Sequence, residues 1–183
     1  MDKRNENIND FKIKNNQLNI KFNTNSTPEK YQEMKYELIP ILINLLDEIS
    51  ILESTFIKKE EELESEKIKL GIPSHQTHPR DKDMWKEYKQ KYRELIEGIC
   101  TEELIEYGFA NSMGDPGEYD YLKTGCELFF IMKSSKRAII EIHFEEGISK
   151  KHQFILRKID DNWKVSDKKY GFTGEKTWYK DNI

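Results

Sequence analysis

The sequence predicts an α+β fold in which helices come first and an antiparallel sheet follows. Between Leu38 and Phe56, apolar residues recur at spacings of three and four, which is the period of an amphipathic helix with one buried stripe. From Tyr119 onward, apolar and polar residues alternate, which is the period of a half-buried strand. This order of elements is typical of α+β domains, in which helices pack on one face of a sheet.

The N-terminal region is rich in Asn and Lys, but residues 11–22 alternate as a strand does. The apolar residues of this segment are Phe11, Ile13, Leu18, Ile20 and Phe22. A turn at Asn15-Asn16 would place them on one face of a small hairpin. A hairpin over residues 11–22 and an extended arm are both consistent with this pattern, so both alternatives stay open.

A long helix is predicted over residues 27–70. Thr27 is placed to cap it, Pro28 suits the first helical position, and Pro40 should kink its early turns. Past Phe56 the apolar stripe thins into a charged segment, which indicates a solvated helical face rather than an acidic interaction tail. The helix should stop at Gly71 because glycine favours helix C-termini.

Two further helices are predicted before the sheet begins. The first starts near Asp81, and its apolar stripe is formed by Trp85, Tyr88, Tyr92, Leu95 and Ile99. Thr101 is placed to cap the second, which is short.

Two hairpins form the predicted sheet. The first turns at Ser134-Ser135 and the second at Asp161-Asn162. In the strand after the first turn, one face is apolar and consists of Ala138, Ile140, Ile142 and Phe144. The opposite face carries Glu141, His143 and Glu145. If the helices cover the apolar face, these three polar side chains point away from the core.

The composition excludes several classes of function. The chain has 183 residues, of which 36% are hydrophobic and 35% charged, with a formal net charge of −4. There is no basic stripe of the kind that binds nucleic acid, and no apolar run that could cross a membrane or act as a signal peptide. Cys100 and Cys126 are expected to be reduced. The sequence therefore predicts a cytoplasmic protein with neither a nucleic-acid nor a membrane partner.

The C-terminal part of the chain resembles a known family. Its motif elements are Phe154, Trp163, Tyr170-Gly171-Phe172 and Trp178-Tyr179, preceded by the loop from Gly114 to Leu122. In this order they resemble the closing segment of the NTF2-fold immunity proteins of bacterial polymorphic toxin systems, and the resemblance covers roughly residues 80–183.

This resemblance implies both a fold and a function. The implied fold is an NTF2-like cone, with N-terminal helices packed on a curved antiparallel sheet. Residues 76–183 would form its core and residues 1–75 an N-terminal extension that packs on the cone or precedes it. The implied function is to bind a cognate toxin domain, a protein partner, and to neutralise it by occluding its active site. The family supplies no catalytic residues to carry over.

The polar sheet face is one candidate site for such a partner. Its residues are Glu127, Glu141, His143, Glu145 and Glu146. An acidic surface of this kind would complement a basic toxin and raise the association rate. The alternative is an ordinary solvated sheet face.

The C-terminal aromatic residues are the second candidate. Trp178 and Tyr179 belong to residue types enriched at protein interfaces. The alternative is that the aromatic cluster after the last strand closes the mouth of the cone.

An enzyme of the isomerase or dehydratase type, acting on a small molecule in the cone cavity, is the competing hypothesis. Such an enzyme needs an Asp or His base in an apolar cavity, and the candidates are Asp120, Tyr121, Glu141 and His143. The sequence has no Gly-rich phosphate loop, nucleophile elbow or Ser/His/Asp pattern. It therefore predicts no catalytic residue and no cofactor. A homodimer paired through the sheet is a third hypothesis.

Metal binding is not expected. His75 and His78 form an HxxH pattern with Asp81 and Asp83 nearby, but this pattern lies in a loop and lacks the helix or cysteines of the usual zinc sites. His152, at the start of a strand, is expected at the surface or at a sheet edge.

Overall fold

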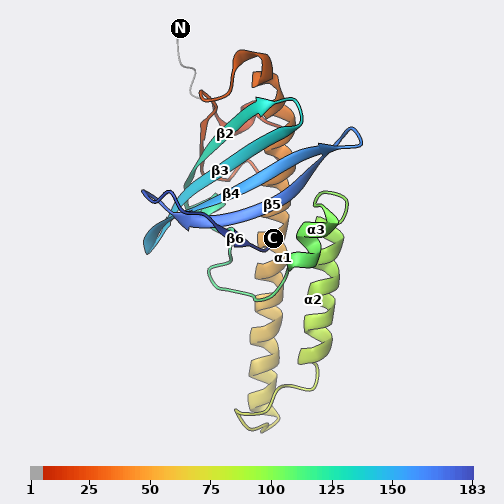
Figure 1. Cartoon of the computed structure of the whole chain (residues 1–183). Coiled ribbons are helices and arrows are strands. Elements are labelled where there is room, and N and C mark those ends of the chain that lie inside the picture. The colour runs from red at the N-terminus through yellow and green to blue at the C-terminus, as the bar shows by residue number, and fades with distance from the viewer. Residues whose placement is uncertain (1–5) are drawn as a thin grey trace.

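The computed structural model describes residues 6–183 and confirms an α+β architecture. One long helix, α1 (Lys35–Lys69), passes behind a six-stranded sheet (Figure 1). Buried side chains of α1, α2, the sheet and the N-terminal segment belong to one hydrophobic core. None of the helices within residues 6–183 is long and apolar enough to cross a membrane.

The sheet is mixed and open. Its strands are β1 (Ile20–Asn23), β2 (Cys126–Ser134), β3 (Arg137–Glu146), β4 (Ile148–Ile159), β5 (Asn162–Phe172) and β6 (Tyr179–Asp181). They lie side by side in sequence order, so that β1 and β6 form the two edges. β1 runs parallel to β2, and every other neighbouring pair is antiparallel.

The predicted alternation in β3 is confirmed. Ala138, Ile140 and Ile142 are fully buried in the core. We call the face on which they lie, which packs on α1, the inner face, and the opposite face the outer face. The second hairpin turns at Asp160 and Asp161, one residue earlier than predicted, and both residues have positive φ (46° and 63°). A tight hairpin turn needs this left-handed backbone, which Asp tolerates better than most residues.

Residues 11–22 do not form the hairpin that was one of the two alternatives. Phe11 and Leu18 are buried, and only the last part of the segment becomes a strand, β1, which pairs with β2 from Ile20 opposite Cys126. The side chain of Asn44 in α1 accepts from the amide of Lys14. Tertiary contacts therefore hold the segment, and the local alternation does not decide its path.

The start of the long helix also differs from the prediction. Thr27 does not cap it: its hydroxyl donates to the carbonyl of Phe130 (2.8 Å) and accepts from the amide of Met132 (3.0 Å) in β2. A short 3₁₀ helix, η2 (Glu29–Met34), intervenes before α1 begins, and Pro40 lies inside α1. Thr27 thus ties the chain to the sheet instead of starting the helix.

The C-terminal half of α1 and helix α2 (Asp81–Ile96) form an antiparallel helical hairpin that extends well beyond the sheet (Figure 1). We call residues 56–96 the stalk. Its buried apolar residues are Phe56 and Leu63 from α1 and Met84, Tyr88, Tyr92 and Ile96 from α2. The rings of Phe56 and Tyr88 lie 5.3 Å apart.

Two short helices and a 3₁₀ turn complete the fold. Thr101 caps α3 (Glu102–Tyr107), as predicted, by accepting from the amide of Leu104. Next to this cap, Cys100 forms an isolated bridge with Val165 of β5. α4 (Tyr121–Thr124) leads directly into β2, and η1 (Ile8–Asp10) lies near the N-terminus.

Candidate functional site

The outer face of the sheet carries several of the predicted partner-binding residues. The register places Glu127 opposite His143 and Phe129 opposite Glu141, and all four side chains point away from α1. In Figure 1, α1 passes on the far side of the sheet and no helix of the described residues lies in front of it.

Apolar side chains lie on the outer face without belonging to the core. Phe129, Ile131 and Ile139 are only partly buried. Ile155, which pairs with Ile139, is 3% exposed yet is not part of the hydrophobic core cluster. The outer face therefore has a row of isoleucines next to the polar residues that the sequence singles out.

Most charges of the predicted acidic strip have partners. The Glu127 carboxylate lies 3.1 Å from Lys21 Nζ, and that of Glu146 lies 2.9 Å from Lys150 Nζ. Glu145 Oε1 accepts from the hydroxyl of Ser149. The strip lies where the alternation predicts, but lysines pair with two of its four carboxylates, which weakens its net negative field.

Glu141 and His143 form a small polar network on this face. His143 Nε2 lies 3.5 Å from Glu141 Oε2, and Gln153 Nε2 donates to Glu141 Oε1 at 2.9 Å. The interaction with His143, followed by the bond from Gln153, holds the pKa of Glu141 below its usual value. The His143 ring also lies 4.7 Å from that of Phe129, so the network is continuous with the apolar part of the face.

The structure separates the last two predicted residues. Trp178 lies on the outer face, where Lys151 Nζ is 4.2 Å from its ring. Tyr179 points to the other side and stacks on Tyr170, with ring centroids 5.2 Å apart. Tyr170 and Tyr179 are 39% and 44% exposed. The aromatic residues after Trp163 are therefore not a closed plug, and Ile183 is the residue of the tail that enters the core.

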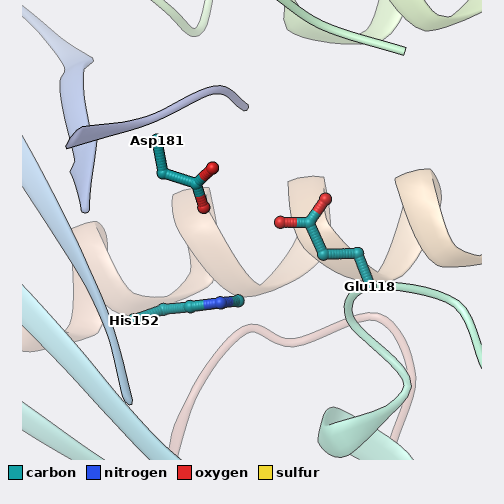
Figure 2. A group of neighbouring side chains, drawn as sticks. All are labelled: Glu118, His152 and Asp181. Atoms are coloured by element: carbon teal, nitrogen blue, oxygen red, sulfur yellow. The ribbon is translucent and has the colours of Figure 1, made fainter. Parts of the chain in front are cut away.

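A second cluster lies on the inner face near the C-terminus. Figure 2 shows Glu118, His152 and Asp181, which come from the loop before α4, from β4 and from β6. One possible ligand atom from each lies within 4.8 Å of the others, which is close enough to hold a metal ion. Among residues 6–183, no other group of three His, Cys, Asp or Glu residues has this property.

Lys168 occupies the place that a cation would take in this cluster. Its side chain is fully buried, and its ammonium group contacts the Glu118 carboxylate and lies 2.9 Å from Asp181 Oδ2. A metal ion would have to displace this buried charge. We therefore interpret the Lys168 cluster (Glu118, His152, Lys168 and Asp181) as an ionic lock that joins the loop, β4, β5 and β6.

His152 is buried, and the expectation of a surface or edge position is wrong. It is 7% exposed, and its Nδ1 lies 3.1 Å from the hydroxyl of Tyr121. Burial, with the nearby charge of Lys168, holds its pKa well below the usual value, so the ring is neutral at neutral pH. The alternation His152, Phe154, Leu156 placed all three on one face and was the signal that could have indicated this burial.

Glu53 is a buried carboxylate that no sequence pattern singles out. It lies on α1 and accepts from the amides of Gly114 and Glu118 at 3.3 and 3.1 Å. Burial raises its pKa, which its two backbone bonds only partly offset. Glu53 thereby shapes the loop that contains the Gly114–Leu122 motif.

Two of the other catalytic and metal candidates, Asp120 and Asp81, accept hydrogen bonds from neighbouring groups. Asp120 accepts from the hydroxyl of Ser50 and from the amide of Gly117, at 2.8 and 3.0 Å. Asp81 accepts from the amide of His78 at 2.6 Å, at the start of α2. These contacts hold a loop and a helix end in place.

Comparisons with known proteins give no family for this chain: no family model, no curated protein and no solved structure matches it.

Proposed function

We propose that the chain is an NTF2-like immunity protein, which binds a cognate bacterial toxin domain through the outer face of its sheet and neutralises the toxin by covering its active site. The observation that carries this proposal is the composition of the outer face. Phe129, Ile131 and Ile139 are partly exposed beside the Glu141–His143 network, with Trp178 at the C-terminal end of the face. Aromatic and apolar residues with a polar surround are typical of protein interfaces.

The packing of the inner face supports binding over catalysis. An isomerase or dehydratase of this type needs an apolar cavity between helices and sheet. In this chain Tyr119, Phe130 and Phe154 fill that space and are fully buried. Lys168, also fully buried, completes the packing.

The ion pairs of the acidic strip refine the proposal. Because Glu127 and Glu146 are paired with lysines, long-range attraction to a basic toxin would be weak. We therefore expect the apolar residues to contribute most of the affinity and the polar network to contribute specificity.

The first test is neutralisation in cells. The toxin-domain candidate encoded next to this gene is expressed with and without the protein, growth is scored, and the complex is isolated by size-exclusion chromatography. Growth rescue with a stoichiometric complex would support the proposal. A toxic neighbour without rescue or complex would contradict that pairing, and a dimer of this chain alone would instead favour the homodimer.

Surface variants then locate the interface. Ile139→Asp should weaken the complex at least about thirtyfold, as expected for a residue at the centre of an interface. Leu70→Asp is the matched control, because Leu70 directly follows the last residue of α1 and is 61% exposed. Equal effects of the two variants, or no effect of Ile139→Asp in a folded protein, would rule out the outer face as the interface.

A further inference from the structure

Basic side chains outnumber acidic ones in one part of the outer face, which lies around β5 and away from the predicted acidic strip. Two cross-strand pairs there have like charges: Arg137 opposite Arg157, and Lys169 opposite Lys180. Like charges directly opposite each other in a sheet repel and are unfavourable. Lys164, which pairs with Arg157, extends this row onto β5.

A groove lies between these two pairs. It has a volume of about 380 Å³ and runs beside β5, between α3 and β6. Arg157, Lys169 and Lys180 line it together with the acidic residues Glu103 and Asp167. Its floor includes Ser166, where β5 has an irregular register with β4.

The positive charges of the groove are only partly compensated. Lys169 Nζ lies 3.6 Å from Asp167 Oδ2, in a half-buried pair. Lys180 Nζ lies 4.0 Å from the ring centroid of Tyr107, and this contact leaves its charge in place. Within residues 6–183, neither Arg137 nor Arg157 takes part in an ion pair.

We propose that this groove binds an acidic segment of the partner protein, with a carboxylate held between Arg157 and Lys180. A carboxylate at this position would relieve the repulsion in both pairs, and the planar guanidinium of Arg157 can donate two bonds to it. The inference rests on the proposed function in one respect, which is that the partner is the toxin domain.

Two features favour an acidic protein segment over a nucleic acid. The isoleucine row follows directly from the basic row, since Ile139 and Ile155 lie two residues from Arg137 and Arg157 on the same face. A protein partner can cover that apolar row, whereas a phosphate backbone would leave it exposed. A flexible peptide can also place its carboxylates at Arg157 and Lys180 and keep them away from Glu103 and Asp167, whereas the fixed spacing of phosphates along a duplex does not adapt in this way.

A peptide experiment tests the groove without the toxin. Fluorescently labelled hexaglutamate is titrated against the full chain at low salt. We expect saturable binding that weakens as salt increases, and at least about a tenfold loss for Arg157→Gln/Lys180→Gln. Lys158→Gln is the control for the removal of a positive charge. Lys158 neighbours Arg157 but pairs with Asp161 at 3.4 Å, so this variant should bind hexaglutamate as the wild type does. Thermal melting of each variant shows that it is folded.

Each outcome decides the inference. Absence of hexaglutamate binding, or equal losses in the Arg157→Gln/Lys180→Gln and Lys158→Gln variants, would overturn it. A DNA duplex that displaces the peptide at equal charge concentration would also overturn it, in favour of a nucleic-acid surface. If the toxin complex forms but does not depend on Arg157 and Lys180, the groove is excluded while the proposed function stands. If hexaglutamate binds at the groove but no toxin complex forms, the groove stands as a site for acidic segments and the proposed function is contradicted.

Discussion

Gly171 sets the path of the C-terminal segment by having no side chain. A Cβ at this position would lie 2.8 Å from the carbonyl oxygen of Thr177 and 3.5 Å from the Trp178 ring. The tail can therefore cross β5 closely enough for Trp178 to reach Lys151. This close approach gives a physical reason for a glycine between Tyr170 and Phe172.

We expect Gly171→Ala to lower the free energy of unfolding by about 1–3 kcal/mol, because the chain must move away from the new methyl group. Urea unfolding followed by tryptophan fluorescence measures this change. Lys176→Ala, an exposed position in the same segment, should stay within about 0.5 kcal/mol of the wild type. Equal stability of the Gly171→Ala protein would show that the tail is not held against β5.

Lys168 is a second residue whose side-chain contacts stabilise the fold. We expect Lys168→Met to lower the free energy of unfolding by about 2–3 kcal/mol, because it leaves the Glu118 and Asp181 carboxylates unpaired. Fully buried pairs cost more, about 3–5 kcal/mol, but these carboxylates are partly solvated. The control is Lys169→Met on the opposite face, whose half-buried pair with Asp167 is a single contact of 3.6 Å and should contribute less than about 1 kcal/mol. If both variants lost the same stability in urea, the ionic lock would be disproved.

At the scale of elements, the stalk and the sheet differ in how deeply they are packed. Between Leu38 and Ile49, α1 has many fully buried side chains under the sheet. In the stalk, the buried apolar residues of α1 are Phe56 and Leu63, and polar side chains surround them. The stalk should therefore open locally at a lower free energy than the sheet.

Hydrogen exchange measures this difference. We expect Leu63→Ala to accelerate exchange of the amides in residues 63–69 and 81–84 at least about tenfold, because it removes much of a thin core. Amides in residues 138–142 of β3 should keep their wild-type rates. Acceleration of both regions to the same extent would mean that stalk and sheet unfold as one unit.

At the scale of the whole molecule, burial of His152 makes stability depend on pH. The folded protein holds the pKa of His152 well below the value of 6.5 that applies to the unfolded chain. As pH falls through about 6.5, the unfolded state takes up a proton that the folded state does not. The free energy of unfolding should therefore decrease between about pH 7 and pH 5.

The His152→Gln variant isolates this effect, because its side chain can still accept from Tyr121 but does not titrate. As pH falls, the free energy of unfolding should decrease more for the wild type than for this variant. Other groups, such as Glu53 with its raised pKa, are common to both proteins. A difference that is constant with pH would show that His152 is accessible to protons in the folded state.

The sequence determined those features that depend on neighbours along the chain. The periods of three to four and of two residues predict α1, α2 and the hairpins, because each period puts one set of side chains on one face. The cap at Thr101 is also local, since its partner amide is three residues away. Likewise, the alternation in β3 places Glu141 and His143 on the outer face.

Only the tertiary structure decided which distant groups meet. Thr27 bonds to β2 because the N-terminal segment lies beside the sheet, although its local sequence suits a helix cap. The acidic strip is partly neutralised because Lys21 and Lys150 lie near Glu127 and Glu146. The register of β5 with β4 and β6 brings Lys168 to Asp181, and brings Arg157 and Lys180 to one groove. Periodicity fixes the face on which a residue lies, whereas long-range pairing fixes its partners, and those partners set its charge, burial and binding role.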